Sequence, residues 1–297
     1  MKIASLLSAG TEIVCALHAG ENLVARSHEC DYPPAITALP AITHPTFDIT
    51  MSSRDIDTAV RNHLASGEPL YQVDIELLES LNPDVIITQS HCVLCAAADH
   101  DLAQHCQRLH GEIVSLKAGT LAGIQRDVLR VGDAIGKTSE ARRYIERDLQ
   151  RREKITQSVA GRPKPTVVVL EWVDPLFAMG NWGPEMVELA GGVCVLGNSG
   201  RHSTAIEAQQ LLQADPDILI IAPCGFDITR ARREAAVLEL IAGWKSLKAV
   251  QQGKVFLADG NRYFNRSGTS ITDSIEILAQ ILHGSGKPAN SAIWQAA

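Results

Sequence analysis

Four of the seven cysteines stand where their thiols could share a site. Cys92 and Cys95 form a Cys-x-x-Cys pair, while Cys30 and Cys224 each follow a predicted strand. Thiolates are soft ligands that suit Zn²⁺ or an iron–sulfur cluster and disfavour Mg²⁺ and Ca²⁺. The thiols therefore predict a soft-metal site made of Cys30, Cys92, Cys95 and Cys224. Thiol redox chemistry at Cys92 and Cys95 and chemically inert loop cysteines are the alternatives.

The remaining cysteines and a run of histidines fit structural roles better. We expect small core side chains at Cys15, Cys106 and Cys194. The histidine gaps do not match zinc-finger spacing, which favours a solvated helix carrying His91, His100, His105 and His110.

Enzyme signatures are sparse in this sequence. It has no Gly-x-x-x-x-Gly-Lys-Ser/Thr loop, no Gly-x-Gly-x-x-Gly after the first strand, no His-Glu-x-x-His and no Gly-x-Ser-x-Gly. A Cys30 nucleophile beside His28 remains open, although adjacent residues rarely form such a pair. Glu12, Glu171 and Asp174 are either acids that position a ligand or caps of helices and strand ends. We therefore expect a binding protein with no catalytic residue.

Polar and aromatic side chains gather directly after the predicted strands. In open parallel sheets, ligands bind beyond the carboxyl ends of the strands. The segments in that position are 28–34, 89–95, 171–175, 223–227 and 259–266. This position predicts ligand contacts by His28, Gln89, Glu171, Trp172 and Phe226.

The composition describes a globular protein of ordinary charge. A chain of 297 residues exceeds what one hydrophobic core usually holds, which predicts two lobes. The net charge of −7, without a Lys/Arg block, disfavours nucleic acid. No apolar run reaches the roughly 20 residues that cross a membrane, so no membrane insertion is expected. An odd number of cysteines fits a reducing compartment, and Glu12 interrupts an otherwise signal-like start. We expect a cytoplasmic protein.

A long helical segment, 121–160, connects the two hydrophobic halves. Its first part places Leu121, Ile124, Val128, Val131 and Ile135 on one helical stripe. Gly136 is typical of a C-terminal cap, and Thr138 of an N-cap that starts a second, charged helix over 139–160. The pattern predicts a stiff helical connector, called here the strut, over residues 121–160.

Two pairs of segments resemble each other across this strut. Residues 77–88 and 211–222 both read as a helix, a Pro-Asp turn and a buried aliphatic strand. Residues 3–20 and 167–192 both read as a strand, a loop and a helix that ends at glycine, with the first of these helices predicted over 11–17. The order predicts two similar α/β lobes, whose alternating helices and aliphatic strands favour mostly parallel sheets. The tail, 284–297, shows little periodicity and is expected to be loose.

The predicted fold is α/β, with two Rossmann-like three-layer lobes, a long backbone helix between them and a ligand cleft between the lobes. The predicted boundaries are 1–120 for the first lobe, 121–160 for the connecting segment and 161–297 for the second lobe with its tail.

Three segments carry a resemblance to a known family. The segments 5–12, 27–34 and 261–266 resemble the cobalamin-binding members of the helical-backbone periplasmic binding proteins. The resemblance covers nearly the whole chain and implies two Rossmann-like lobes, one connecting helix and a corrinoid held between the lobes. It also implies delivery of the ligand to components of an ABC transporter. The chain is similar to a cytosolic branch of that family that lacks a signal peptide.

The resemblance also implies a set of ligand-binding residues. A corrin has flat apolar faces, amides at its rim and a phosphate on its nucleotide loop, so aromatic and arginine side chains suit it. The implied residues are Ser8, Thr11, Glu12, Tyr32, Phe177, Arg262, Tyr263, Phe264 and Arg266. The predicted function is the binding of cobalamin or a related metal chelate, such as haem or a ferric siderophore. A cysteine-ligated zinc or iron–sulfur protein and a thiol-redox enzyme are the alternatives.

Overall fold

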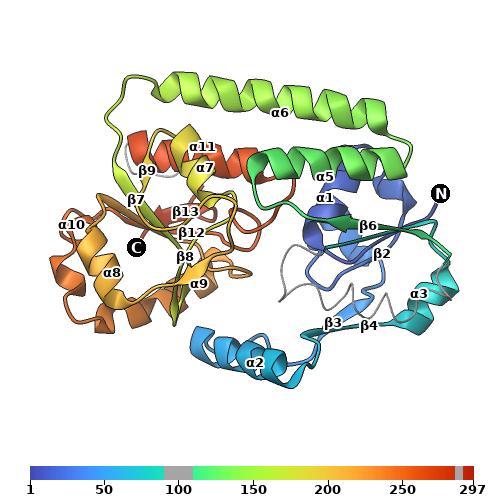
Figure 1. The fold of residues 1–297 in the computed structure, drawn as a ribbon, viewed down its shortest axis with the longest axis horizontal. Coiled ribbons are helices and arrows are strands. Elements are labelled where there is room, and N and C mark those ends of the chain that lie inside the picture. Colours follow the sequence, from blue (N-terminus) through green and yellow to red (C-terminus); the bar gives the residue numbers. More distant parts are fainter. Residues whose placement is uncertain (90–109, 285–289) are drawn as a thin grey trace. The chain divides into compact units, whose positions relative to one another are not determined.

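The computed structural model describes residues 1–89, 110–284 and 290–297 (Figure 1). The chain divides into two compact units. Unit 1 comprises Met1–Met51, Asp55–Arg147 and Ser267–Thr269, and unit 2 comprises Ser52–Arg54, Asp148–Arg266 and Ser270–Ala297.

Unit 1 is built on a four-stranded sheet in the order β2-β1-β5-β6, with every pair parallel. Its strands are β1 (Ile3–Ser5), β2 (Leu23–Arg26), β5 (Val85–Gln89) and β6 (Glu112–Leu116). A separate antiparallel pair is formed by β3 (Thr43–Pro45) and β4 (Tyr71–Val73). The helices of this part of the chain are α1 (Ser8–Ala16), η1 (Gly20–Asn22), η2 (Pro34–Ala38), α2 (Ser53–Ser66), α3 (Ile75–Leu81) and α5 (Leu121–Ala134).

Both faces of the unit 1 sheet are covered, which makes unit 1 a three-layer fold. Successive residues of a strand point to opposite faces. Ile3 therefore packs in one cluster with Ile13 of α1 and Val128 of α5, whereas Ala4 packs in another with Leu78 of α3. Burial on both faces explains why these strands read as continuous aliphatic runs rather than as alternating ones.

Unit 2 is built on a larger, mixed sheet in the order β10-β8-β7-β11-β12-β13, with β9 paired to β7. Its central strands are parallel, and the outer strands β8, β10 and β13 pair antiparallel. The strands are β7 (Thr166–Val173), β8 (Leu176–Ala178), β9 (Val193–Cys194), β10 (Thr204–Ala205), β11 (Ile218–Ile221), β12 (Val255–Ala258) and β13 (Trp294–Ala296). The helices are α7 (Gly183–Leu189), α8 (Ala208–Ala214), α9 (Ile228–Ala235), η3 (Ala236–Leu240), η4 (Trp244–Ser246), α10 (Lys248–Gln251) and α11 (Ile271–His283).

The unit 2 sheet is also covered on both faces. Val168 and Leu219 share a cluster with Leu211 of α8. On the opposite face, Val167 lies with Val187 of α7 and Leu282 of α11 around Gly192, where an added Cβ would meet all three within 3.0 Å.

The repeat predicted from the sequence is present in the topology. The order β2-β1-β5-β6 in unit 1 matches β9-β7-β11-β12 in unit 2. The aspartate of each Pro-Asp turn makes the same kind of hydrogen bond. Asp84 accepts a hydrogen bond from the Lys2 N–H at 2.6 Å, and Asp217 accepts one from the Thr166 N–H at 2.8 Å. Each aspartate therefore fixes the start of the neighbouring strand.

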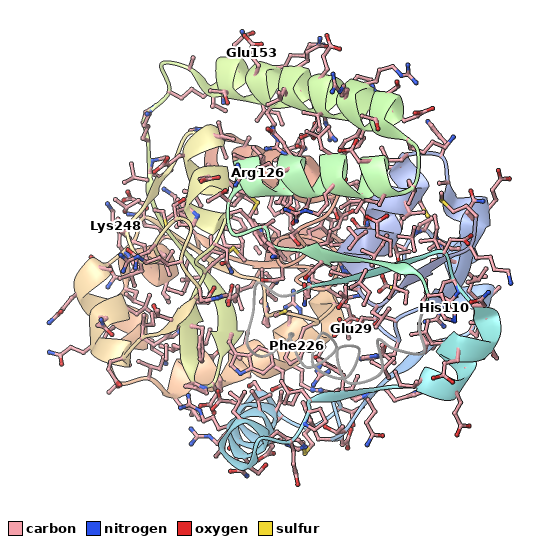
Figure 2. All side chains as sticks on the ribbon, turned by 45° about the vertical axis from the view of Figure 1, so that its right-hand side comes forward. Glu29, His110, Arg126, Glu153, Phe226 and Lys248 are labelled. Atoms are coloured by element: carbon pink, nitrogen blue, oxygen red, sulfur yellow. The ribbon has the colours of Figure 1, made fainter. Side chains whose placement is uncertain are left out.

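The long helical segment has the predicted break. α5 ends at Ala134, Gly136 takes the left-handed conformation with φ of +68°, and α6 (Thr138–Val159) follows. The prediction for Thr138 as an N-cap is wrong, because Thr138 is the first residue of α6. Its hydroxyl donates to Asp133 Oδ1 at 2.7 Å instead. The second half of α6 carries charged side chains outward, as Glu153 shows in Figure 2.

Two other expectations also need correction. The first helix begins at Ser8 and not at Thr11, so the Ser8-Ala9-Gly10 stretch is its first turn rather than a loop. The tail is not loose at its end, because β13 pairs with β12 and the ring of Trp294 packs against Phe256 at 5.6 Å. Within the described residues, no helix is long and apolar enough to cross a membrane.

Candidate functional site

An aromatic stack lies at the carboxyl edge of the unit 2 sheet. Trp172 stands near the end of β7, and Phe226, labelled in Figure 2, follows β11, so both lie at the same edge of the sheet. Their ring centroids are 5.0 Å apart, and the Arg230 guanidinium lies 3.8 Å from the centroid of the Phe226 ring. Phe177 lies beside Trp172 in the pairing of β7 with β8. Phe226 is only 2% exposed, so the ring surface that a ligand could reach is that of the half-buried Trp172, which Phe226 and the Arg230 guanidinium support from behind.

Hydrogen bonds hold the indole of Trp172 in one orientation. Its Nε1–H donates to the carbonyl oxygens of Ser53 at 3.1 Å and of Asp174 at 3.2 Å. Asp174 in turn pairs with Arg54 at 2.9 Å. The backbone N–H and the hydroxyl of Ser53 both donate to Glu234 Oε2, at 2.9 and 3.0 Å. Burial acts to raise the pKa of Glu234, but these bonds and Arg233 outweigh it and lower that pKa.

The loop after β12 brings further arginines to the same edge. Gly260 is required there, because a Cβ would lie 2.1 Å from the Pro223 carbonyl oxygen of the loop after β11. Asp259 Oδ1 accepts the N–H groups of Asn261 and Arg262, at 2.9 and 3.0 Å. Burial is the main reason that the pKa of Asp259 is raised.

These loop arginines face different partners. The Arg262 guanidinium lies 5.2 Å from the centroid of the Tyr263 ring. Arg266 is buried and donates to Asn261 Oδ1 at 3.0 Å. Arg230, Arg262 and Arg266 therefore give this edge of unit 2 a concentration of positive charge.

The aromatic pair Tyr263 and Phe264 is less available to a ligand than predicted. Phe264 is 1% exposed, its N–H is bonded to Ser274 Oγ, and its carbonyl oxygen accepts from Trp182 Nε1. Its ring is therefore part of the unit 2 core, and a ligand contact by Phe264 stays a prediction. Tyr263 is also buried, with its ring next to Arg262.

In unit 1, His28 follows β2 and is held by hydroxyl groups. Thr43 Oγ1 accepts from the His28 N–H at 3.0 Å and lies 2.7 Å from His28 Nδ1. Because the Thr43 hydroxyl donates to Ser27 Oγ, its oxygen accepts from Nδ1–H, which leaves Nε2 with a lone pair. Nε2 is buried without a hydrogen-bond partner among the described residues. Burial is the main reason that the pKa of His28 is lowered, so the ring is neutral at pH 7.

Most of the other predicted ligand-binding residues of unit 1 are buried or make hydrogen bonds to residues of the same unit. Ser8 Oγ donates to the Glu29 carbonyl oxygen at 2.9 Å, and Thr11 Oγ1 lies 3.1 Å from Cys30 Sγ. Thr11 and Cys30 are both buried, and Glu12 is buried too. Tyr32 and Gln89 are half-buried at the ends of their segments. A contact role for Ser8, Thr11 and Glu12 stays a prediction.

A short strap from late in the chain covers Glu12. The strap, Ser267–Thr269, belongs to unit 1 although its neighbours in sequence belong to unit 2. Thr269 Oγ1 donates to Glu12 Oε2 at 3.3 Å, and Tyr144 donates its hydroxyl to the Thr269 carbonyl oxygen at 3.3 Å. A Cβ on Gly268 would lie 2.7 Å from Glu12 Oε2, so the strap needs glycine at that point.

The predicted thiol site is only partly within the described residues. Cys92, Cys95 and Cys106 lie outside them, as do His91, His100 and His105. Cys30 is buried and Cys224 is exposed, and the described residues hold no group of three His, Cys, Asp or Glu side chains that could bind a metal ion. Cys15 and Cys194 are half-buried, and burial raises the pKa of Cys194 to about 11. These last two thiols are therefore poor nucleophiles, as expected for structural cysteines.

Arg230, Thr43, Ser53 and Asp259 are candidate site residues that the sequence did not reveal. The place of Arg230 could have been predicted from the sequence, because it stands four residues after Phe226 at the start of a helix. Asp227 caps that helix by accepting the Arg230 N–H at 2.8 Å. Thr43 had none, since its approach to His28 depends on the pairing of β3 with β4.

Two α/β units of matching strand order, each with polar and aromatic groups at the carboxyl edge of its sheet, define a solute-binding fold. The chain belongs to the periplasmic binding protein family Peripla_BP_2, whose family model matches residues 3–261. Since this is a family of binding proteins, the protein is a solute-binding protein and not an enzyme. The expectation of a binding protein rather than an enzyme is thereby confirmed, and the thiol-redox alternative is not supported.

Individual relatives are distant in sequence and similar in fold. The chain is 21% identical to the high-affinity heme uptake system protein IsdE of Staphylococcus aureus (strain MRSA252), over 73% of this chain and 72% of that one. It is similar in structure to the periplasmic vitamin B12 binding protein BtuF of Vibrio cholerae, with a TM-score of 0.67, 21% identity and coverage of 95% and 96%. A periplasmic heme binding protein from Pseudomonas aeruginosa has a TM-score of 0.71, 18% identity and coverage of 99% and 96%. The predicted two-lobed α/β fold is confirmed.

Proposed function

We propose that this protein binds a corrinoid, or a related tetrapyrrole chelate, at the carboxyl edge of its unit 2 sheet. The observation that carries the proposal is the half-buried Trp172 ring, which hydrogen bonds, Phe226 and Arg230 hold in place in unit 2. A flat macrocycle packs well on aromatic rings, and its rim phosphate or carboxylate groups pair with guanidinium. The ligands of two similar proteins, vitamin B12 for BtuF and heme for IsdE, support the same class of ligand.

In unit 1, His28 is suited to bind a metal, which supports a metal chelate as the class of ligand. A neutral imidazole with Nδ1–H bonded to a fixed oxygen presents Nε2 as a metal ligand of defined orientation. His28 has this arrangement with Thr43. Nε2 is the atom of His28 that would bind the cobalt or iron of a chelate.

Haem is the second candidate ligand, favoured by the three arginines at the unit 2 edge. Haem carries two carboxylates, which Arg230, Arg262 and Arg266 are suited to pair with. Delivery of either ligand to components of an ABC transporter belongs to the same proposal. The cytoplasmic location and thiol ligation by Cys92 and Cys95 remain predictions.

Spectral titration tests this proposal. Hydroxocobalamin and haemin are each titrated into purified protein, and the visible spectrum and the heat of binding are recorded. We expect saturable binding of one of them, weakened at least about tenfold by Trp172→Ala or Phe226→Ala, because each removes stacked ring area. Trp244→Phe is the matched control, since this aromatic residue lies outside the candidate site. Absence of binding by both ligands at high micromolar concentration would refute the proposal.

A further inference from the structure

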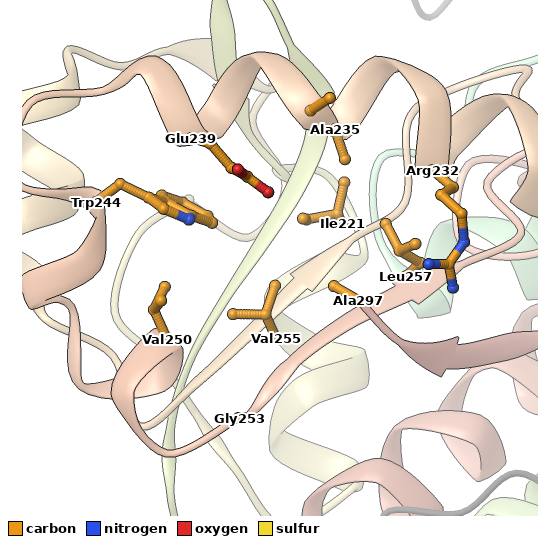
Figure 3. Close-up of a pocket in the computed structure, with 11 residues that line it drawn as sticks. Ile221, Arg232, Ala235, Glu239, Trp244, Val250, Gly253, Val255, Leu257 and Ala297 are labelled. Carbon is orange, nitrogen blue, oxygen red and sulfur yellow. The ribbon is translucent and has the colours of Figure 1, made fainter.

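Unit 2 holds a pocket beside β11 and β12 that shares no residue with the candidate site. Its volume is about 300 Å³. The floor is the side of the sheet formed by Ile221, Val255 and Leu257, and α9, η3, η4 and α10 form the walls (Figure 3). This volume is at the lower end for a small-molecule site.

The pocket is open because its walls carry small residues. Ala235 and Ala236 stand where α9 passes into η3, and Gly253 stands at the turn before β12. An added Cβ on Gly253 would meet no atom within 4 Å, which locates open space at this turn. The floor side chains Ile221 and Leu257 are each 1% exposed, so the pocket reaches down to the hydrophobic core.

Opposite charges stand at two places on the rim. The Arg232 guanidinium is engaged, since it donates to the Ala296 carbonyl oxygen at 3.3 Å. Glu239 directs its carboxylate into the pocket between Trp244 and Ile221 (Figure 3). In the described parts of the chain, no hydrogen bond or ion pair to this carboxylate is present. The rim therefore carries a carboxylate beside an indole ring, and the guanidinium of Arg232 is held at another place on the rim by the Ala296 carbonyl oxygen.

We infer that this pocket binds a small organic cation. The positive group lies between the Trp244 ring and the Glu239 carboxylate, and the apolar part rests on Ile221, Val255 and Leu257. A desolvated cation gains from the negative face of an indole as well as from a carboxylate. A neutral molecule of the same shape gains neither, and an anion is repelled by Glu239.

The pocket is distinct from the proposed chelate site, although both touch α9. Arg230 faces the Phe226 ring, whereas Arg232 and Ala235 line the pocket. Residues two apart on a helix point in nearly opposite directions. A test of organic-cation binding in this pocket is therefore independent of a test of chelate binding at the candidate site.

Choline and its neutral isostere 3,3-dimethylbutan-1-ol test the inference. Binding of each to the full chain is measured by calorimetry and by the change in tryptophan fluorescence. We expect choline to bind at least about tenfold more tightly than the alcohol, the ratio given by a cation–π contact combined with a counter-charge. Trp244→Phe should abolish most of the fluorescence change while calorimetry still detects choline.

Two variants test separately the charge of Glu239 and the volume of the pocket. Glu239→Gln should weaken choline about tenfold and leave the alcohol unchanged, and Ala235→Leu should abolish binding of both by filling the pocket. Glu153→Gln, on the outer side of α6, is the matched control and should change nothing. Circular dichroism checks that each variant is folded. Equal affinity for choline and the alcohol, no choline binding at millimolar concentration, or no effect of Glu239→Gln would overturn the inference.

Discussion

His28 illustrates how single residues of this protein are fixed in one chemical form. Its ring is bonded through Nδ1 to Thr43 and stacks on Tyr71 with centroids 5.2 Å apart. Glu29 acts to raise the pKa of His28, but burial and the nearby His44 lower it. The neutral tautomer is therefore built into the fold rather than selected by a ligand.

This arrangement predicts a particular pH dependence. The pKa of His28 is lower in the folded chain than its ordinary value of 6.5. The stability that it contributes is therefore fully present above about pH 6.5 and is lost as the pH falls toward the folded pKa. Nuclear magnetic resonance should find a His28 titration midpoint below 6.5, and Thr43→Val should change the tautomer.

A denaturation experiment supplies the control for His28. Between pH 7 and pH 5, the free energy of unfolding should fall less in His28→Asn than in the natural chain, because asparagine has no proton to gain. His18→Asn, at an exposed histidine, is the matched variant. A midpoint at or above 6.5 would contradict the prediction.

The sequence located some site residues and not others, for physical reasons. Trp172 and Phe226 were predictable because they directly follow buried aliphatic strands, and such positions meet at one edge of a parallel sheet. The burial of Phe264 was not predicted, because its neighbours Arg262 and Arg266 suggested a ligand loop. Its left-handed backbone, with φ of +66°, turns the residue into the core, and no sequence pattern indicates this.

Among the elements, α6 and α11 are joined by a buried polar network. Arg152 pairs with Asp148 at 2.6 Å, and the two side chains are only 7% and 9% exposed. Arg152 Nε donates to Thr272 Oγ1 at 2.9 Å, and Thr272 donates to Asp148 Oδ1 at 2.5 Å. The three side chains satisfy one another, so a charged pair is tolerated within unit 2.

Removing one charge from this network should cost more than removing both. Arg152→Met leaves Asp148 buried without its counter-charge, and we expect a loss of about 3 kcal/mol of unfolding free energy. The double variant Asp148→Leu/Arg152→Met should lose less than Arg152→Met alone. Urea denaturation measures both, with Arg147→Met on the same helix as a surface control. A double variant that loses as much unfolding free energy as Arg152→Met, or more, would contradict this account.

The elements with strong periodicity were predicted best. α5 and α6 agree with the aliphatic spacing of their sequences, and Gly136 marks the break between them. The start of α1 was missed because Ser8-Ala9-Gly10 has the composition of a loop. Gly10 is needed there, since a Cβ would lie 2.7 Å from Ile87. β13 was missed because three residues are too few to show a period.

At the scale of the whole molecule, one strand order is used twice. The two Pro-Asp segments predicted it, and Asp84 and Asp217 now explain why both copies keep that turn. The antiparallel strands β8, β10 and β13 belong to unit 2 alone. They were not predictable from the repeat, because unit 1 has no counterpart for them among its described residues.

Ligand binding should be visible in the stability of the whole chain. A ligand that binds only the folded state adds about 2.7 kcal/mol when its concentration is a hundred times its dissociation constant. Scanning calorimetry with hydroxocobalamin should therefore raise Tm by several degrees, and Phe226→Ala should show a smaller rise at the same ligand concentration. An equal rise in Phe226→Ala would contradict binding at the aromatic stack.

The strap Ser267–Thr269 has a consequence for the order in which the chain is made. A ribosome completes every strand of unit 1 long before it reaches the strap, and amino-terminal units generally fold first. Until Thr269 emerges, its hydrogen bonds with the Glu12 carboxylate and the Tyr144 hydroxyl cannot form. Unit 1 is thus synthesised first but receives its last segment only near the end of translation. A chain cut before Ser267 would lack this segment of unit 1.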